Sequence, residues 1–116
     1  MAEECWPWPG EMDGVLAAPR SHRVLIDNDS VRVLEVAIDP GRAEPEHTHR
    51  QPSVVIVDGP ARIRYYARGL LESESPPGEP AGPTRASWMP PEGPHSVENI
   101  DSKPYHAIRV ELKRPA

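Results

Sequence analysis

The chain has 116 residues, the size of one domain. Its 18 acidic and 13 basic residues give a formal net charge of −5. This charge argues against nucleic acid or an acidic membrane as a partner. No apolar run approaches the ~20 residues of a membrane span. The acidic start lacks the basic and apolar regions of a signal peptide, so a cytoplasmic protein is expected.

Residues 1–14 are predicted to form an N-terminal arm, and residues 15–116 a single barrel domain. Trp6 and Trp8 each precede a proline, which disfavours a helix at that point. Two exposed tryptophans would be unfavourable. They are therefore expected to pack on the barrel or on a second subunit, with a disordered tail as the alternative.

Short runs of Val, Ile and Leu between many proline and glycine residues predict an all-β protein. In the clearest strand, Leu34, Val36 and Ile38 alternate on one face and are expected in the core. His22 begins the strand before it and is expected on the surface. The predicted strands cover residues 22–26, 31–38, 47–49, 53–57, 61–67, 88–89, 96–99 and 105–113.

The segment Gly41–His49 carries two of the five histidines. A turn at Gly41 and the proline at Pro45 exclude a helix. Successive side chains of a strand point to opposite faces, so His47 and His49 project from the same face. The pattern predicts a short strand whose two imidazoles are close enough to hold one metal ion.

The second half of the chain contains two further alternating segments. In residues 61–67, Ala61, Ile63 and Tyr65 are expected inside and the arginines outside; inward arginines would instead bind a carboxylate. Residues 70–86 are rich in proline and acids and are expected to form a mobile loop. In the last strand, His106, Ile108, Val110 and Leu112 are predicted to face inward, with Arg109, Glu111 and Lys113 on the other face.

Two motifs resemble those of the cupin superfamily. Gly41, five residues and then His47-Thr48-His49 are similar to the first motif, with Gly59 as its closing glycine. The glutamate of that motif is absent, because Ser53 or Val54 stands in its place. Residues 90–99 (PPEGPHSVEN) are similar to the second motif; His95 and Asn99 keep its spacing, and the glycine comes one residue late.

The resemblance covers about residues 20–113. It implies a double-stranded β-helix barrel of short antiparallel strands, assembled as a homodimer, with Asn99 as a structural residue near the barrel mouth. A small barrel of this kind can enclose one small ligand.

The resemblance also implies that His47, His49 and His95 bind a divalent transition metal. Imidazole ligands suit iron, nickel, copper and zinc, whereas manganese prefers carboxylates. Iron is the first candidate, and zinc, nickel, copper and manganese are the alternatives. Gln51 has the parity of a fourth ligand, although a loop glutamine is the favoured interpretation. His106 is either a fourth ligand, a general acid/base or a core histidine.

A three-histidine centre resembles that of iron-dependent cupin dioxygenases which cleave diketones. We therefore expect a metal-dependent enzyme of the oxygenase type, acting on a small polar organic molecule within the barrel. Ser53, Tyr65 and Trp88 are the predicted pocket residues. Two alternatives stay open: a non-catalytic small-molecule-binding or sensor cupin, and a metal-dependent isomerase, lyase or decarboxylase.

Overall fold

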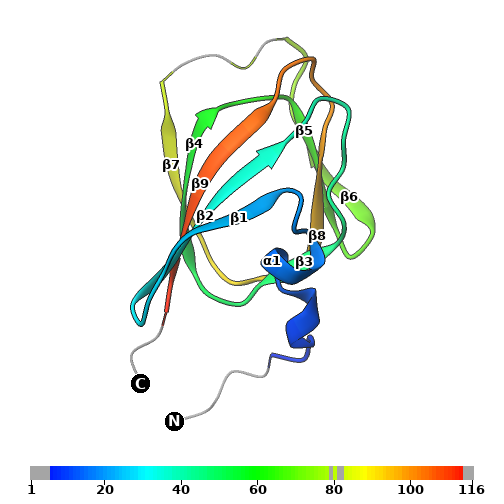
Figure 1. Cartoon of the computed structure of the whole chain (residues 1–116). Helices are drawn as coiled ribbons and strands as arrows, with labels where there is room; N and C mark the ends of the chain where they lie inside the picture. The colour runs from blue at the N-terminus through cyan, green and yellow to red at the C-terminus, as the bar shows by residue number, and fades with distance from the viewer. Residues whose placement is uncertain (1–5, 79, 81–82, 114–116) are drawn as a thin grey trace.

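The computed structural model describes residues 6–78, 80 and 83–113. Within this part, the chain forms a short 3₁₀ turn, one short helix and nine strands (Figure 1). The elements are η1 (Gly10–Met12), α1 (Gly14–Ala17), β1 (His22–Asp27), β2 (Val31–Ile38), β3 (His47–His49), β4 (Ser53–Gly59), β5 (Ile63–Ala67), β6 (Leu70–Glu74), β7 (Arg85–Met89), β8 (Glu92–Asn99) and β9 (Tyr105–Leu112). None of the described helices is long and apolar enough to cross a membrane.

The strands form two sheets that face each other around the interior of a barrel (Figure 1). One sheet has the strand order β1-β2-β9-β4-β7, and the other has the order β3-β8-β5-β6. All paired strands in both sheets run antiparallel. The expected barrel of short antiparallel strands is therefore confirmed.

The prediction of a loop over residues 70–86 is wrong at both of its ends. β6 pairs with β5, and Glu74 lies opposite Arg64 and forms an ion pair with it. Arg68 and Gly69 between these strands both have positive φ, 53° and 81°, as a two-residue type I′ hairpin turn requires. The cross-strand ion pair and the tight turn thus stabilise a strand in a segment whose sequence is polar and lacks alternation.

The barrel interior is unusually polar. Among the described residues, the buried hydrophobic side chains are Ala18, Leu34, Val36, Ile38, Ala61 and Ala107. The buried polar and charged ones are more numerous: Ser21, His22, Glu44, His47, Thr48, His49, Ser53, Glu92, His95, Asn99, Arg109 and Glu111. The inward orientation of Leu34, Val36 and Ile38 on β2 is confirmed.

The predicted orientation of β9 is wrong. Ala107, Arg109 and Glu111 face the interior and are buried, whereas His106, Ile108, Val110 and Leu112 are only partly buried. The charges tolerate burial because they are paired: Arg109 with Glu92, and Glu111 with Arg32. Apolar side chains therefore lie on the outside of this sheet.

These outer side chains form a continuous row across the five-stranded sheet. In the strand registers, Ile26 lies opposite Val33, Val33 opposite Val110, Val110 opposite Val54, and Val54 opposite Trp88. Ile26 is 51% exposed and Trp88 59% exposed. We call this set the outer apolar row. Trp88 therefore does not line the pocket, contrary to the prediction, because its neighbours on β7, Ser87 and Met89, take the inward positions.

Candidate metal centre

The structure brings the three predicted metal ligands together inside the barrel. His47 and His49 lie on β3 and His95 on β8, with His47 directly opposite His95 in the register. All three are buried. The ring centroids of His47 and His95 are 4.4 Å apart, those of His47 and His49 5.0 Å, and those of His49 and His95 5.3 Å.

A fourth histidine joins them. His22 begins β1, is 4% exposed, and its ring centroid lies 4.7 Å from that of His47 and 5.2 Å from that of His49. The expectation that His22 lies on the surface is wrong. Its partner in the register is Val36, which faces the interior, so the pairing of β1 with β2 turns His22 inward as well.

In each of the four imidazoles, Nδ1 lies within hydrogen-bond distance of an acceptor oxygen. These acceptors are the carbonyl oxygens of Ala18 for His22 (3.1 Å), Pro45 for His47 (2.8 Å) and Gly93 for His95 (2.8 Å), and the Glu111 carboxylate for His49 (3.0 Å). A neutral imidazole that donates Nδ1–H leaves the Nε2 lone pair free as a ligand atom.

Burial favours the neutral form of three of these imidazoles. It lowers the pKa of His22, lowers that of His47 to about 3, and lowers that of His49 well below its usual range. Neighbouring buried imidazoles that are neutral and hydrogen-bonded at Nδ1 are the donor set that a transition metal requires. The residues present therefore fit a metal ion.

A carboxylate reaches the same cluster from β8. Glu92 is 9% exposed, and its Oε2 lies 3.6 Å from Nε2 of His95. Ligand atoms of His49, Glu92 and His95 lie within 4.8 Å of one another, as do those of His22, His47 and His49. The register explains this, because a bulge in β8 sets Glu92 opposite His49 and His95 opposite His47. Glu92 thus places a carboxylate beside the imidazoles of His49 and His95.

Glu44 is a second buried carboxyl group beside the imidazoles. Its Oε1 lies 3.8 Å from Nε2 of His47, and its Oε2 accepts a hydrogen bond from the Ser21 hydroxyl at 2.8 Å. Burial raises the pKa of Glu44 to about 7, although the hydrogen bond from Ser21 opposes this shift. Glu44 can therefore take up or release a proton near neutral pH.

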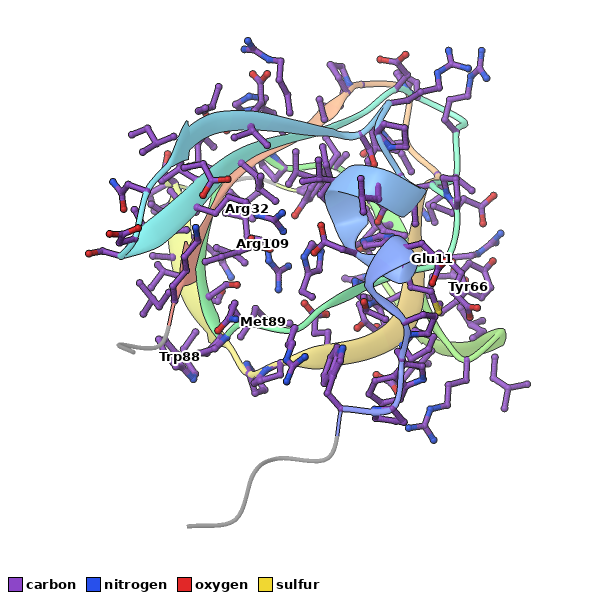
Figure 2. The ribbon with its side chains drawn as sticks, turned by 60° about the horizontal axis from the view of Figure 1, so that its bottom comes forward. Glu11, Arg32, Tyr66, Trp88, Met89 and Arg109 are labelled. Carbon is purple, nitrogen blue, oxygen red and sulfur yellow. The ribbon has the colours of Figure 1, made fainter. Side chains whose placement is uncertain are left out.

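The cluster borders a cavity of about 220 Å³. Tyr65 lines it, as predicted; its hydroxyl donates to Glu92 Oε2 at 2.7 Å, and its ring stacks on His95. Arg109 projects into the middle of the barrel (Figure 2). Ser53, predicted for the pocket, is fully buried beneath Arg109, whose Nε donates to its hydroxyl at 3.1 Å.

No protein-family model and no curated protein matches this sequence. Solved structures are similar to it. A cupin domain from Bordetella pertussis Tohama I has a TM-score of 0.67 at 21% identity, covering 80% of this chain and 92% of that one. An RmlC-like cupin from Methanocaldococcus jannaschii has a TM-score of 0.58 at 13% identity, covering 79% and 78%. The DMSP lyase DddQ from Ruegeria pomeroyi has a TM-score of 0.51 at 21% identity, covering 73% of this chain and 39% of that one.

The chain has the cupin fold. Asn99 has the structural role that the cupin resemblance implies, because it is fully buried and its amide donates to the carbonyl oxygens of Ile38 and Lys103, both at 2.9 Å.

Two predicted residues lie away from the centre of the cupin barrel. Gln51 is half-buried and lines a separate groove of about 580 Å³ beside the N-terminal arm, so it does not take the place of the missing glutamate. His106 lies on the outer face of β9, where its ring nitrogens contact Asp58 and Glu35. The inward position predicted for His106 is therefore wrong, for the reason given for β9.

The N-terminal segment covers one end of the cupin barrel, where α1 lies next to β3 (Figure 1). Gly14 sits directly on the imidazoles: a Cβ atom at this position would stand 2.8 Å from Cε1 of His49. Trp8 packs on Gly93, where a Cβ atom would stand 2.8 Å from the indole ring. The expected packing of the tryptophans on the barrel is thus confirmed for Trp8, and the late glycine of the second motif makes room for it.

Five residues of the site are not predicted from the sequence: His22, Glu44, Glu92, Arg109 and Glu111. One of them left a signal in the sequence. The Gly93–Pro94 pair interrupts the alternation before His95, as a bulge does, and a bulge moves Glu92 to the face of His95. His22, Arg109 and Glu111 are placed by pairings between strands, which the sequence does not display, and Glu44 lies in the connection before β3, where no strand alternation assigns its face.

Proposed function

We propose that this cupin binds one divalent transition metal through Nε2 of His47, His49 and His95. His22 is the fourth imidazole within reach, and Glu92 is the carboxylate within reach. The observation that carries the proposal is the hydrogen-bond acceptor at each Nδ1, which leaves Nε2 of all four imidazoles free as a ligand atom. A set dominated by imidazole favours iron, with zinc, nickel and copper as alternatives, over manganese.

We propose further that the site is catalytic and acts on a small polar organic molecule in the cavity, with oxygenase chemistry as the leading class. A bound metal ion would supply Lewis acidity toward a carbonyl or enolate oxygen and, for iron, reactivity with dioxygen. The chain contributes the proton transfers. Glu44, with a pKa of about 7, can remove a proton from a carbon or hydroxyl group next to the metal position.

Two other functions use the same residues. A lyase or isomerase would need only the Lewis acid and Glu44, and a binding or sensor protein would need only the cavity. The DMSP lyase among the structural neighbours shows that this fold carries lyase activity in another protein.

The first test is elemental analysis of untagged protein purified without chelators. About one equivalent of iron, zinc, nickel or copper is expected per chain, and the double variant His47→Ala/His49→Ala is expected to lose it. The matched control is His106→Ala, a histidine on the outer face of the barrel, which should keep full metal content. A protein without metal after reconstitution with each ion would overturn the metal centre.

The reaction class is then decided with defined metal forms. Oxygen uptake by the iron form in the presence of acetylacetone, with none by the zinc form, would support the oxygenase. Turnover of substrate by the zinc form under nitrogen would support the lyase or isomerase instead.

We also propose that the protein is a homodimer that packs through the outer apolar row. Monomeric proteins rarely expose a large contiguous apolar patch, and this row crosses all five strands of the sheet. The row also supplies a physical reason for the orientation of β9, since its outward Val110 would be covered in the dimer.

A further inference from the structure

Arg109 places a cation in the wall of the candidate active-site cavity. It is 7% exposed and projects from the inner face of β9 toward the middle of the barrel (Figure 2). Burying a guanidinium group is unfavourable unless it is paired and hydrogen-bonded. A guanidinium group inside so small a barrel therefore needs hydrogen-bond partners.

Two of its three nitrogen atoms have partners in the protein. Nε donates to the Ser53 hydroxyl at 3.1 Å, and Nη2 donates to Glu92 Oε1 at 2.6 Å. Within the described part of the chain, Nη1 has no hydrogen-bond partner, and no fully buried side-chain nitrogen or oxygen lacks one. Nη1 therefore reaches accessible space, and the cavity that Arg109 lines is the space on its inner side.

The rest of the cavity wall shows what else a ligand must offer. Beyond the imidazoles and the acidic groups, Tyr65, Tyr105, Ser87 and Met89 line the cavity together with aliphatic side chains from both sheets: Val36, Ile38, Val55, Val57, Ile63 and Val97. Its volume of about 220 Å³ lies below the ~300 Å³ at which pockets for drug-sized ligands begin. The wall thus fits a short aliphatic body that carries a polar head.

We propose that the cavity takes a small monocarboxylate, as the acid anion or as an enolate of a keto acid, whose anionic oxygen binds Nη1 of Arg109. This inference rests on the proposed function in that it assigns the substrate class of the same site. A monoanion fits better than a phosphate, because Glu92 already neutralises part of the guanidinium charge and one free nitrogen offers few donors.

Glu92 then lies next to the proposed substrate and competes with it for the guanidinium group of Arg109. Its Oε1 is held by Arg109, and its Oε2 accepts from Tyr65 and faces His95. Removing the charge of Glu92 should free the guanidinium for a carboxylate ligand. Neutralising both residues should abolish the preference for an anion. These opposite changes distinguish an anion site from a purely structural ion pair.

The test uses isobutyrate and its uncharged isostere isobutyramide as probes, with dissociation constants from ligand-observed NMR titrations. Both metal-free and zinc-loaded full-length protein are titrated. The variants are Glu92→Gln, Arg109→Gln/Glu92→Gln and the control Arg64→Gln, an arginine that pairs with Glu74 on the outside of the barrel. The double variant avoids leaving a buried carboxylate without its partner.

In the native protein and the Arg64→Gln control, isobutyrate is expected to bind about tenfold or more tightly than isobutyramide, the size of a hydrogen bond to a charged group. Glu92→Gln should increase this ratio, and the double variant should bring it to within about twofold of unity. An unchanged ratio in the double variant, or equal binding of both probes to the native protein, would overturn the proposal.

The metal-free titrations separate this inference from the metal centre. A carboxylate preference that depends on Arg109 in metal-free protein supports the anion site even if elemental analysis finds no metal. Full metal content with no preference for the anion leaves the metal centre in place and removes the substrate assignment.

Discussion

His49 and Glu111 form a buried pair in which Nδ1 of the imidazole lies 3.0 Å from Oε2 of the carboxylate. The other oxygen of Glu111 accepts from Arg32 at 2.5 Å, and Arg32 also binds Asp13 at 2.8 Å. A chain of charges thus runs from the residue that precedes α1 to a proposed metal ligand. Carboxylates in this position orient the imidazole and raise its basicity toward a metal.

We predict that Glu111→Gln weakens metal binding by about 10–100-fold, because the amide no longer offers His49 a charged acceptor. The measurement is a competition titration with a chromophoric chelator. Glu74→Gln, which removes a carboxylate from the exposed Arg64–Glu74 pair, should leave the affinity unchanged. Equal affinities of Glu111→Gln and native protein would show that the pair does not act on the metal.

His22→Ala should separate the two candidate ligand groups. If His22 is a ligand, the cobalt-substituted variant will show a changed visible absorption spectrum and an affinity lower by about tenfold or more. Glu92→Gln, analysed in the same way, tests the group formed by His49, Glu92 and His95. A cobalt spectrum that His22→Ala leaves unaltered would assign the fourth position to Glu92 or to solvent.

Gly14→Ala tests the contact between the N-terminal segment and the imidazoles. The added methyl group would stand 2.8 Å from Cε1 of His49, so α1 or the ring must move. We expect a loss of about 1–3 kcal/mol in the free energy of unfolding of the metal-free protein, as for other overpacked sites. Gly10→Ala is the control, since a Cβ atom there meets nothing within 4 Å. Similar urea denaturation midpoints for the two variants would refute the close contact.

The pH dependence of stability should report on His106. Hydrogen bonds to Asp58 and Glu35 raise the pKa of His106 above its usual value of 6.5, and the same contacts lower the pKa values of both carboxyl groups. The folded state therefore holds the imidazole proton more tightly than the unfolded state. This stabilisation is fully present below pH 6.5, while the carboxylates stay ionised, and is lost as the pH rises through the folded-state pKa.

His106→Gln should accordingly be less stable than the native protein at about pH 5.5 and nearly equal to it at about pH 9. Urea denaturation at both pH values, at low and at high salt, measures the difference. Because the groups are partly exposed, high salt should reduce it. A difference that grows toward high pH would contradict the assignment.

The proposed dimer is tested by placing charges in the outer apolar row. Ile26→Asp/Trp88→Asp should raise the dimer dissociation constant by about 100-fold or more, since it buries two unpaired charges in an apolar contact. Light scattering coupled to size-exclusion chromatography gives the mass. Leu70→Asp/Leu71→Asp is the matched control, because these exposed leucines lie on β6 in the other sheet. A native protein that elutes as a monomer would overturn the dimer.

How far the sequence predicts this fold depends on which faces of its strands are apolar. β2 has apolar residues on its buried face, so Leu34, Val36 and Ile38 are predicted correctly. β9 has its charged residues inside, so the same rule inverts its orientation and puts His106 in the pocket. Hydrophobic alternation finds the strand in both cases, but it assigns the faces correctly only where the interior is apolar.

In the candidate site, too, some residues can be predicted from the sequence and others cannot. The spacing of His47 and His49 within one short strand is a local property and is visible in the sequence. The position of His22 is set by the pairing of β1 with β2, where it lies opposite Val36, and that of Arg109 by the pairing of β2 with the distant β9, where it lies opposite Leu34. No spacing rule reaches across such pairings, and this is why the sequence suggests only three of the four clustered imidazoles.

The polar interior of the barrel bears on how the protein persists in a cell. Burial of apolar surface is the main driving force of folding, and this chain buries few apolar side chains among its described residues. Converging imidazole lone pairs add no attraction of their own. The metal-free chain should therefore be marginally stable, and a metal present at 100 times its dissociation constant would add about 2.7 kcal/mol. Under metal starvation the protein should become a substrate for proteases, so that its abundance would follow the supply of the ion.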